Sequence, residues 1–249
     1  MKIIFMGTPE FAVYSLEVLK ERGDEVALVI SQEDKPKGRG KKLQPTPVKE
    51  RALEYGYEVY QPKKVREKEA VEIIKNINPD LIVVTAFGQI LTKEILDIPK
   101  YGCINVHASL LPKYRGAAPI NFAIINGESQ SGITTMYMGE GLDTGDMILS
   151  DSIKIEDEDT AGVLHDKLAK LSKKTLKETL DLIEKGRAPR SVQEHEKSTY
   201  APMMNKELGH IDFSKEAQSI VNLVKGVDPW PSAYANLNGE VVILSSVKL

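Results

Sequence analysis

This chain of 249 residues contains one cysteine, one tryptophan and four histidines, and it has no long apolar run. The lone Cys103 excludes an internal disulfide framework and suits a reducing compartment, so we expect a cytoplasmic protein. The apolar start is short and is closed by Gly7, Thr8 and Pro9, so we expect no secretion signal. Because no run has the length needed to span a bilayer, we also expect no membrane segment.

The chain also has no strong excess of charge. Its net charge is −3 at pH 7, with 41% hydrophobic and 28% charged residues, which is ordinary for a globular protein. This balance excludes a globally basic nucleic-acid binder, so any contact with nucleic acid must come from a local patch. The length suits one large domain, or one domain followed by a smaller one.

Two metal-binding patterns, H-E-x-x-H and C-x-x-C, are absent, and we expect no metal site. A nucleophilic role for Cys103 would require an exposed thiol of lowered pKa. Its place in an apolar run predicts a packed strand residue instead.

Strand and helix patterns alternate through the first part of the chain. An apolar run over residues 2–6, a helical pattern and a second run over 26–30 predict one βαβ unit, with Thr8 capping the helix. The continuous run 81–84 is typical of a strand buried on both faces of a parallel sheet. The first turn lacks the G-x-G-x-x-G pattern, which argues against dinucleotide binding. The pattern predicts an α/β fold with a Rossmann-like, mostly parallel sheet.

Residues 101–119 combine a buried strand with a polar turn. Asn105 and His107 are two residues apart, so on a strand they project from one face. An amide donor beside an imidazole can polarise a carbonyl and move a proton. On its residues alone, His107 fits a structural histidine as well as a catalytic one.

A basic segment lies within residues 31–47. Five cations fall in eight residues, interrupted by Pro36, Gly38 and Gly40: Lys35, Lys37, Arg39, Lys41 and Lys42. The segment fits either a solvated loop or a flexible cationic arm for phosphate. It has no interleaved aromatic residue, so base stacking is not predicted.

Residues 139–146 contain three glycines and three acids around Leu142. This composition fits a flexible surface turn, or a loop that holds one carboxylate beside His107. A calcium loop would need further acids and a closing glutamate, which are missing.

These motifs together resemble the formyltransferases that use 10-formyltetrahydrofolate. The resemblance rests on Asn-x-His followed by S-L-L-P at 109–112, and on G-L-D-T-G-D at 141–146. The R-G-A-A-P continuation at 115–119 is similar to that of methionyl-tRNA formyltransferases. The resemblance implies formyl transfer from this folate to the α-amine of initiator methionyl-tRNA, without a metal.

The resemblance also implies site residues. Asn105 and His107 would hydrogen-bond the oxyanion, and Asp143 would favour the protonated form of His107. Folate contacts are implied for two segments: Phe87, Gly88, Gln89 and Ile90, then Ser109, Leu110, Leu111 and Pro112. The five basic residues named above would contact the tRNA.

The domain organisation that the resemblance implies is a catalytic domain over 1–185, a linker over 186–205 and a C-terminal part over 206–249. That last part would be the start of a small OB-type β-barrel that binds tRNA. It opens near Asp228-Pro229-Trp230-Pro231, where the family has asparagine first. Because the family continues for several strands, we expect this chain to be truncated, and we expect a monomer.

Three other functions remain open. The chain could formylate a small amine such as a glycinamide ribonucleotide or a sugar nucleotide, although the basic segment and R-G-A-A-P argue against this. It could hydrolyse formyltetrahydrofolate. It could also be a non-catalytic RNA-binding module, although the intact Asn105, His107 and Asp143 argue against that.

Overall fold

The computed structural model describes residues 1–37, 42–245 and 247. The chain forms two compact units. The first contains Met1–His107, Thr134–Leu149 and Ala169–Gln193, and the second contains Ala108–Ile133, Ser150–Leu168 and Glu194–Leu249.

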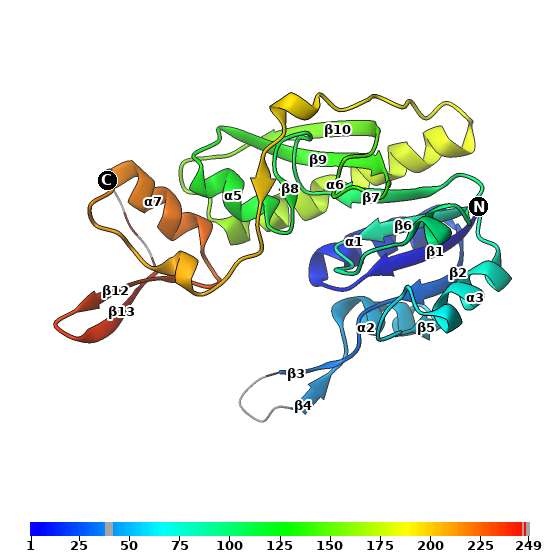
Figure 1. Cartoon of the computed structure of the whole chain (residues 1–249), viewed down its shortest axis with the longest axis horizontal. Coiled ribbons are helices and arrows are strands. Elements are labelled where there is room, and N and C mark those ends of the chain that lie inside the picture. The colour runs from blue at the N-terminus through cyan, green and yellow to red at the C-terminus, as the bar shows by residue number, and fades with distance from the viewer. Residues whose placement is uncertain (38–41, 246, 248–249) are drawn as a thin grey trace. The chain divides into compact units, whose positions relative to one another are not determined.

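A seven-stranded sheet dominates the fold, in the order β10-β9-β7-β6-β1-β2-β5 (Figure 1). Strand β1 pairs in parallel with β2 and β6, β2 pairs in parallel with β5, and β6 does so with β7, whereas β7 and β9 are antiparallel. The strands are β1 (Lys2–Gly7), β2 (Glu25–Ile30), β5 (Val59–Tyr60), β6 (Leu81–Thr85), β7 (Cys103–His107), β9 (Gln130–Tyr137) and β10 (Met147–Lys154). The predicted mostly parallel sheet is confirmed.

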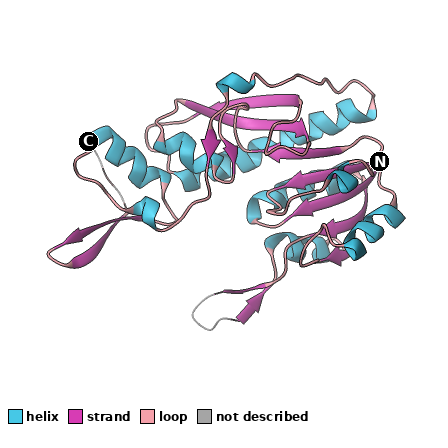
Figure 2. Cartoon of the chain, viewed as in Figure 1, coloured by secondary structure: helices cyan, strands magenta, loops and turns pink. Residues whose placement is uncertain are grey.

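Helices separate most of these strands along the chain, whereas β10 follows β9 directly (Figure 2). The helices are α1 (Glu10–Arg22), α2 (Pro47–Glu54), α3 (Lys68–Ile77), α4 (Lys93–Leu96) and α6 (Ala161–Glu184). Helix α1 ends at Gly23, whose φ of 73° is left-handed and therefore favours glycine. No helix in the described ranges is long and apolar enough to cross a membrane.

The cap predicted at Thr8 is wrong. Pro9 occupies the N-cap position of α1, and no side chain caps that helix. The Thr8 hydroxyl instead donates to the carbonyl of Phe87 at 3.2 Å. Because Thr8 follows β1 and Phe87 follows β6, this bond joins the carboxyl ends of two neighbouring parallel strands. Ligands in open α/β sheets bind at that edge.

The core of the first unit lies on the central strands. Two central strands contain fully buried side chains, at residues 3–6 of β1 and 81–83 of β6. Each such side chain contributes roughly 1.5–3 kcal/mol by leaving water. Because of this burial, strands β1, β6 and β7 form a rigid frame, and their polar ends project from it.

The basic segment is more regular than its composition predicts. Strands β3 (Lys35–Lys37) and β4 (Lys42–Gln44) pair as an antiparallel hairpin, with Lys35 opposite Gln44 and Pro36 opposite Leu43. Proline is tolerated there because a two-stranded ribbon has outer edges that need no donor. Arg39 and Lys41 lie outside the described residues, and the side chains of Lys37 and Lys42 are not described.

The second unit holds β8 (Arg115–Gly116), α5 (Pro119–Ile125), β11 (Tyr200–Ala201), α7 (Ala217–Gly226), β12 (Ala233–Leu237) and β13 (Glu240–Leu244). Two short 3₁₀ helices flank β11 in the sequence. His195–Lys197 precedes it and Glu207–Gly209 follows it. Strands β12 and β13 form an antiparallel hairpin. Gly116 pairs with Ala201, and a Cβ at Gly116 would lie 2.6 Å from the Ala201 carbonyl oxygen. The glycine of R-G-A-A-P is therefore required by close backbone packing.

Candidate active site

The three predicted catalytic residues lie together in the first unit. Asn105 Nδ2 donates to Asp143 Oδ1 at 3.3 Å, and Asp143 Oδ2 lies 3.7 Å from His107 Nδ1. The side chains of His107 and Asp143 are only 6% and 12% exposed. One carboxylate therefore faces both an amide and an imidazole in a largely desolvated site.

Strand β7 holds Asn105 and His107 on a rigid frame. Asn105 is paired with Val84 of β6 on one side and with Met136 of β9 on the other. His107 ends the strand, opposite Thr134. Because β7 is an interior strand, the two side chains keep the spacing that strand geometry gives them.

The third residue comes from the loop between β9 and β10. Asp143 has a φ of 49°, a left-handed conformation that is uncommon outside glycine and that Asp and Asn tolerate best. Gly145 lies so close to the Tyr137 carbonyl that a Cβ there would overlap it. Tyr137 N donates to the carbonyl of Asp146 at 2.9 Å. The glycine and these backbone contacts fold the loop so that Asp143 turns towards β7.

Asp146, the second aspartate of the motif, has different surroundings. Its carboxylate is 3.5 Å from Arg190 Nη1, and both side chains are partly exposed. Arg190 also stacks over the ring of Tyr137, 3.7 Å from its centroid. This aspartate helps to shape the loop, whereas Asp143 faces the histidine.

No pattern in the sequence marks Gln193, a further polar residue at this loop. Its side chain is 2% exposed, and Nε2 donates to the carbonyls of Asp143 at 2.9 Å and Gly145 at 2.8 Å. It lies in the segment predicted to be a charged linker. Its neighbours Val192 and Glu194 are exposed, so a single inward-facing amide there gives no periodic signal.

The first predicted folate segment follows β6. Phe87 is 2% exposed, and its carbonyl also accepts from Gln32 Nε2 at 2.8 Å. Gln89 Oε1 accepts from Val65 N at 2.7 Å, which fixes this segment to the chain before α3. Ile90, by contrast, is 75% exposed. An exposed isoleucine on a fixed backbone is suited to form the wall of a ligand site.

The second predicted folate segment lies in the second unit. Ser109 is buried, and its hydroxyl donates to the carbonyl of Lys113 at 2.7 Å. Leu110 packs against Gly132, where a Cβ would be 2.5 Å from a Leu110 methyl group. Leu111 is 7% exposed. These side chains hold the turn that ends at Pro112, and their role towards folate stays a prediction.

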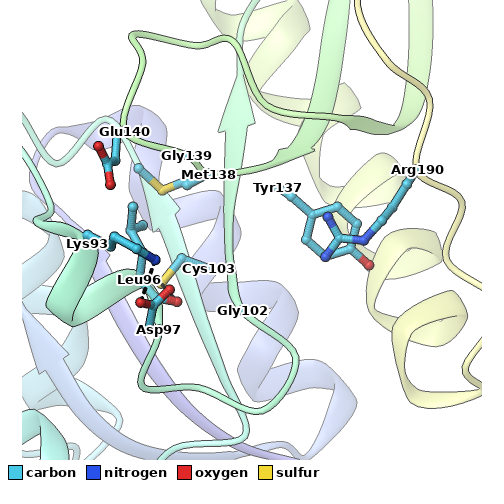
Figure 3. Close-up of a pocket in the computed structure, with 10 residues that line it drawn as sticks. All are labelled: Lys93, Leu96, Asp97, Gly102, Cys103, Tyr137, Met138, Gly139, Glu140 and Arg190. Carbon is cyan, nitrogen blue, oxygen red and sulfur yellow. Dashed lines mark hydrogen bonds and ion pairs between the residues drawn. The ribbon is translucent and has the colours of Figure 1, made fainter.

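A cavity of about 220 Å³ lies beside Cys103, the first residue of β7 (Figure 3). Leu96, Cys103 and Met138 line it with apolar surface, and Gly139 and Glu140 come from the loop that carries Asp143. The remaining lining residues are Lys93, Asp97, Gly102, Tyr137 and Arg190. The cavity therefore lies at the start of β7, where Cys103 stands two residues before Asn105 in the sequence.

Cys103 acts as a wall of this cavity and not as a nucleophile. Burial, with a smaller contribution from Asp97, raises the pKa of its thiol to about 12. A thiol with such a pKa holds almost no thiolate at neutral pH, and the thiolate is the reactive form. Across the described part of the chain, no three His, Cys, Asp or Glu residues group as a metal site would require.

The basic segment can be followed only in part. Lys35 Nζ donates to Gln32 Oε1 at 3.0 Å. Gln32 is the residue whose amide also donates to the Phe87 carbonyl. The first cation of the segment is thus connected, through one glutamine, to the predicted folate segment.

Comparison with known proteins gives the family. A model of the formyl transferase family matches residues 1–180, and a model of the formyl transferase C-terminal domain matches 203–249. The methionyl-tRNA formyltransferase of Clostridioides difficile (strain 630) is 61% identical over all 249 residues, which cover 81% of that protein. That of Agathobacter rectalis is 54% identical over the same length and is covered to 80%.

Among solved structures, an N-formyltransferase from Helicobacter canadensis, in complex with folinic acid and dTDP-3-aminofucose, has the same fold. It is 22% identical with a TM-score of 0.71, and the match covers 96% of this chain and 85% of that one. Both family models and the identity to the two bacterial enzymes lead to one conclusion. The chain belongs to the formyl transferase family and, within it, to the methionyl-tRNA formyltransferases.

Proposed function

We propose that this protein transfers the formyl group from N10 of 10-formyltetrahydrofolate to the α-amino group of methionyl initiator tRNA. The observation that carries the proposal is the placement of Asp143 against both Asn105 and His107 at the end of β7. This trio supplies what acyl transfer to an amine requires, namely preorganised donors and a carboxylate that can take up charge or a proton.

The reaction has two bond changes. The amine lone pair attacks the formyl carbon, a new C–N bond forms, and the carbonyl π electrons move to oxygen. Loss of the amine proton and collapse of the oxyanion then break the bond to N10, which takes a proton and leaves as tetrahydrofolate. In this mechanism Asn105 and protonated His107 donate hydrogen bonds to the oxyanion, and Asp143 balances the charge of His107.

The size of these effects is consistent with the roles. One preorganised oxyanion donor contributes on the order of 3 kcal/mol, or roughly a hundredfold in rate. The low exposure of His107 and Asp143 strengthens such interactions because water does not screen them. Asp143 also helps to remove the amine proton, through a water molecule where the amine is out of reach.

For the formyl donor, we assign the cavity beside Cys103 as the binding site. We also assign the exposed side chain of Ile90 as an apolar surface that the donor contacts. Leu96, Cys103 and Met138 offer apolar surface to a flat ring, and the Glu140 carboxylate is an acceptor for ring N–H groups. The segments Phe87–Ile90 and Ser109–Pro112 are each proposed to contact the folate. The donor is a substrate, and the reaction needs no metal.

For the tRNA, we assign the basic segment with its five cations: Lys35, Lys37, Arg39, Lys41 and Lys42. Replacing these cations should weaken tRNA binding and flatten its dependence on salt, because each lost phosphate contact lowers the logarithmic slope by about one unit. Donor binding should stay within threefold. The enzyme is proposed to act as a monomer, which sedimentation measurements would check.

The test is a transfer assay with labelled 10-formyltetrahydrofolate, run with methionyl initiator tRNA, with an aminated sugar nucleotide and without any acceptor. We expect label on methionyl initiator tRNA and none on an aminated sugar nucleotide. Release of formate without any acceptor would instead identify a hydrolase. Label on the sugar nucleotide alone would identify a small-amine formyltransferase. Binding of tRNA without any donor turnover would leave an RNA-binding module, and each of these three outcomes would overturn the proposal.

A further inference from the structure

We infer that Gln193 positions Asp143 for catalysis. We also infer that residues 190–193, which follow α6 and are called the brace below, support the loop of residues 139–146. This inference rests on the proposed function, because it assigns Asp143 a part in formyl transfer. Gln193 donates to backbone carbonyls of the loop, so the role inferred for it is positioning and not chemistry.

The brace has three points of contact with the loop and the start of β10. At one end Arg190 lies 3.5 Å from the Asp146 carboxylate. In the middle, Ser191 and Met147 exchange two backbone hydrogen bonds of 2.8 and 3.0 Å. At the other end Gln193 Nε2 donates to the carbonyls of Asp143 and Gly145. The segment therefore runs beside the whole stretch from 143 to 147.

Gln193 is the contact best placed to set the carboxylate. Its side chain is 2% exposed, so its hydrogen bonds are not in competition with water. The two carbonyls it binds belong to Asp143 itself and to the glycine two residues on. An amide that holds both carbonyls fixes the turn between them, and with it the left-handed φ of 49° at Asp143.

The direction of the Asp143 carboxylate depends on that turn. Its two oxygens reach Asn105 at 3.3 Å and His107 at 3.7 Å. A shift of about 1 Å at the loop would lose these contacts, and misplacements of that size cost on the order of a hundredfold in rate. Without the Gln193 amide, two partly buried carbonyls would also lose a donor, which favours a different loop conformation.

The experiment is a double-mutant cycle on the full chain, with labelled formyl transfer to methionyl initiator tRNA as the assay. Gln193→Met keeps the length and removes the donor, and Gln193→Asn keeps an amide that is one methylene too short. Both should lower kcat by about 10- to 100-fold while the dissociation constant of the donor stays within threefold. Ser191→Ala is the matched control, because Ser191 acts through its backbone and its side chain is exposed. It should leave kcat within twofold.

The second half of the cycle separates positioning from general stability. In an Asp143→Asn background the Gln193→Met change should cost less than about threefold, since the carboxylate that Gln193 positions is already gone. An equal loss in both backgrounds, or a raised KM with unchanged kcat, would overturn the inference. Should Gln193→Met fail to fold, Gln193→Asn carries the same cycle. An inactive wild-type chain would contradict the proposed function, whereas an active wild type with fully active Gln193 variants would contradict this inference alone.

Discussion

Asp143 Oδ2 lies 3.7 Å from His107 Nδ1, although the histidine ends a buried strand and the aspartate belongs to a loop. Asn105 donates to the other carboxylate oxygen at 3.3 Å. The pair is therefore held by two separate structures: the interior strand β7, and the loop between β9 and β10. Substitutions in the strand and substitutions in the loop should therefore have distinguishable effects on catalysis.

The two aspartates of the loop should behave differently. Asp143→Asn removes the charge beside His107 and should lower kcat by about 100-fold, or roughly 2.7 kcal/mol. Asp146→Asn is the matched control, because its ion pair with Arg190 is partly exposed and worth at most about 1 kcal/mol. Steady-state formyl transfer measures both. Equal losses from the two substitutions would contradict the assignment of Asp143.

Two glycines of the same loop offer a test of its packing. Gly145→Ala places a Cβ against the Tyr137 carbonyl, and the strain should cost about 2 kcal/mol or more in the free energy of unfolding. Gly139→Ala meets open space and does not require a left-handed φ, so it should cost less than about 1 kcal/mol. Thermal and denaturant unfolding compare the two variants. Equal stabilities would mean that the loop does not pack on Tyr137 as described.

Cys103 should resist thiol reagents in the folded protein. With the pKa of the thiol raised to about 12, the thiolate fraction at pH 8 is about one in 10⁴, and Cys103 is also buried. Because Cys103 is the single cysteine, a colorimetric thiol assay reports on it alone. We expect one thiol in denaturant and none within minutes in buffer. Rapid reaction of the native protein would show that the Cys103 thiol is accessible to the reagent, which contradicts its burial.

The exposed Ile90 should contribute to donor binding. Ile90→Ser removes apolar surface from the proposed wall and should weaken the donor by about tenfold, since buried apolar area is worth roughly 25 cal/mol per Å². Leu53→Ser is the control, because Leu53 is also well exposed, at 57%, but belongs to α2. Calorimetric titration of the donor compares them. A similar effect of both substitutions, or of neither, would remove Ile90 from the proposed site.

The frame of the fold could be predicted because it depends on local patterns. Continuous apolar runs identify β1 and β6 as buried strands. Asn105 and His107 could be placed on one face because the period of a strand is two. Their contact with Asp143 came from the resemblance of motifs and agrees with the geometry, although no residue pattern fixes the path of a loop.

The features that escaped prediction depend on contacts between distant segments. The Thr8 hydroxyl donates to Phe87 and not to its own helix, because two strand ends meet there. Gln193 lies 50 residues from the carbonyl of Asp143 that it binds. The pairing of Lys35 with Gln44 could not be predicted, because the segment has no alternation of apolar and polar residues. Such contacts follow from the tertiary fold and leave little trace in local composition.

The most direct test of the account is the rate of formyl transfer by His107→Ala against wild type, at saturating donor and methionyl initiator tRNA. We predict transfer by the wild type and a loss of at least about 100-fold in the variant, with donor affinity within threefold, because an oxyanion donor acts only in the transition state. An unchanged rate in His107→Ala would contradict the catalytic role of the site built around Asn105, His107 and Asp143.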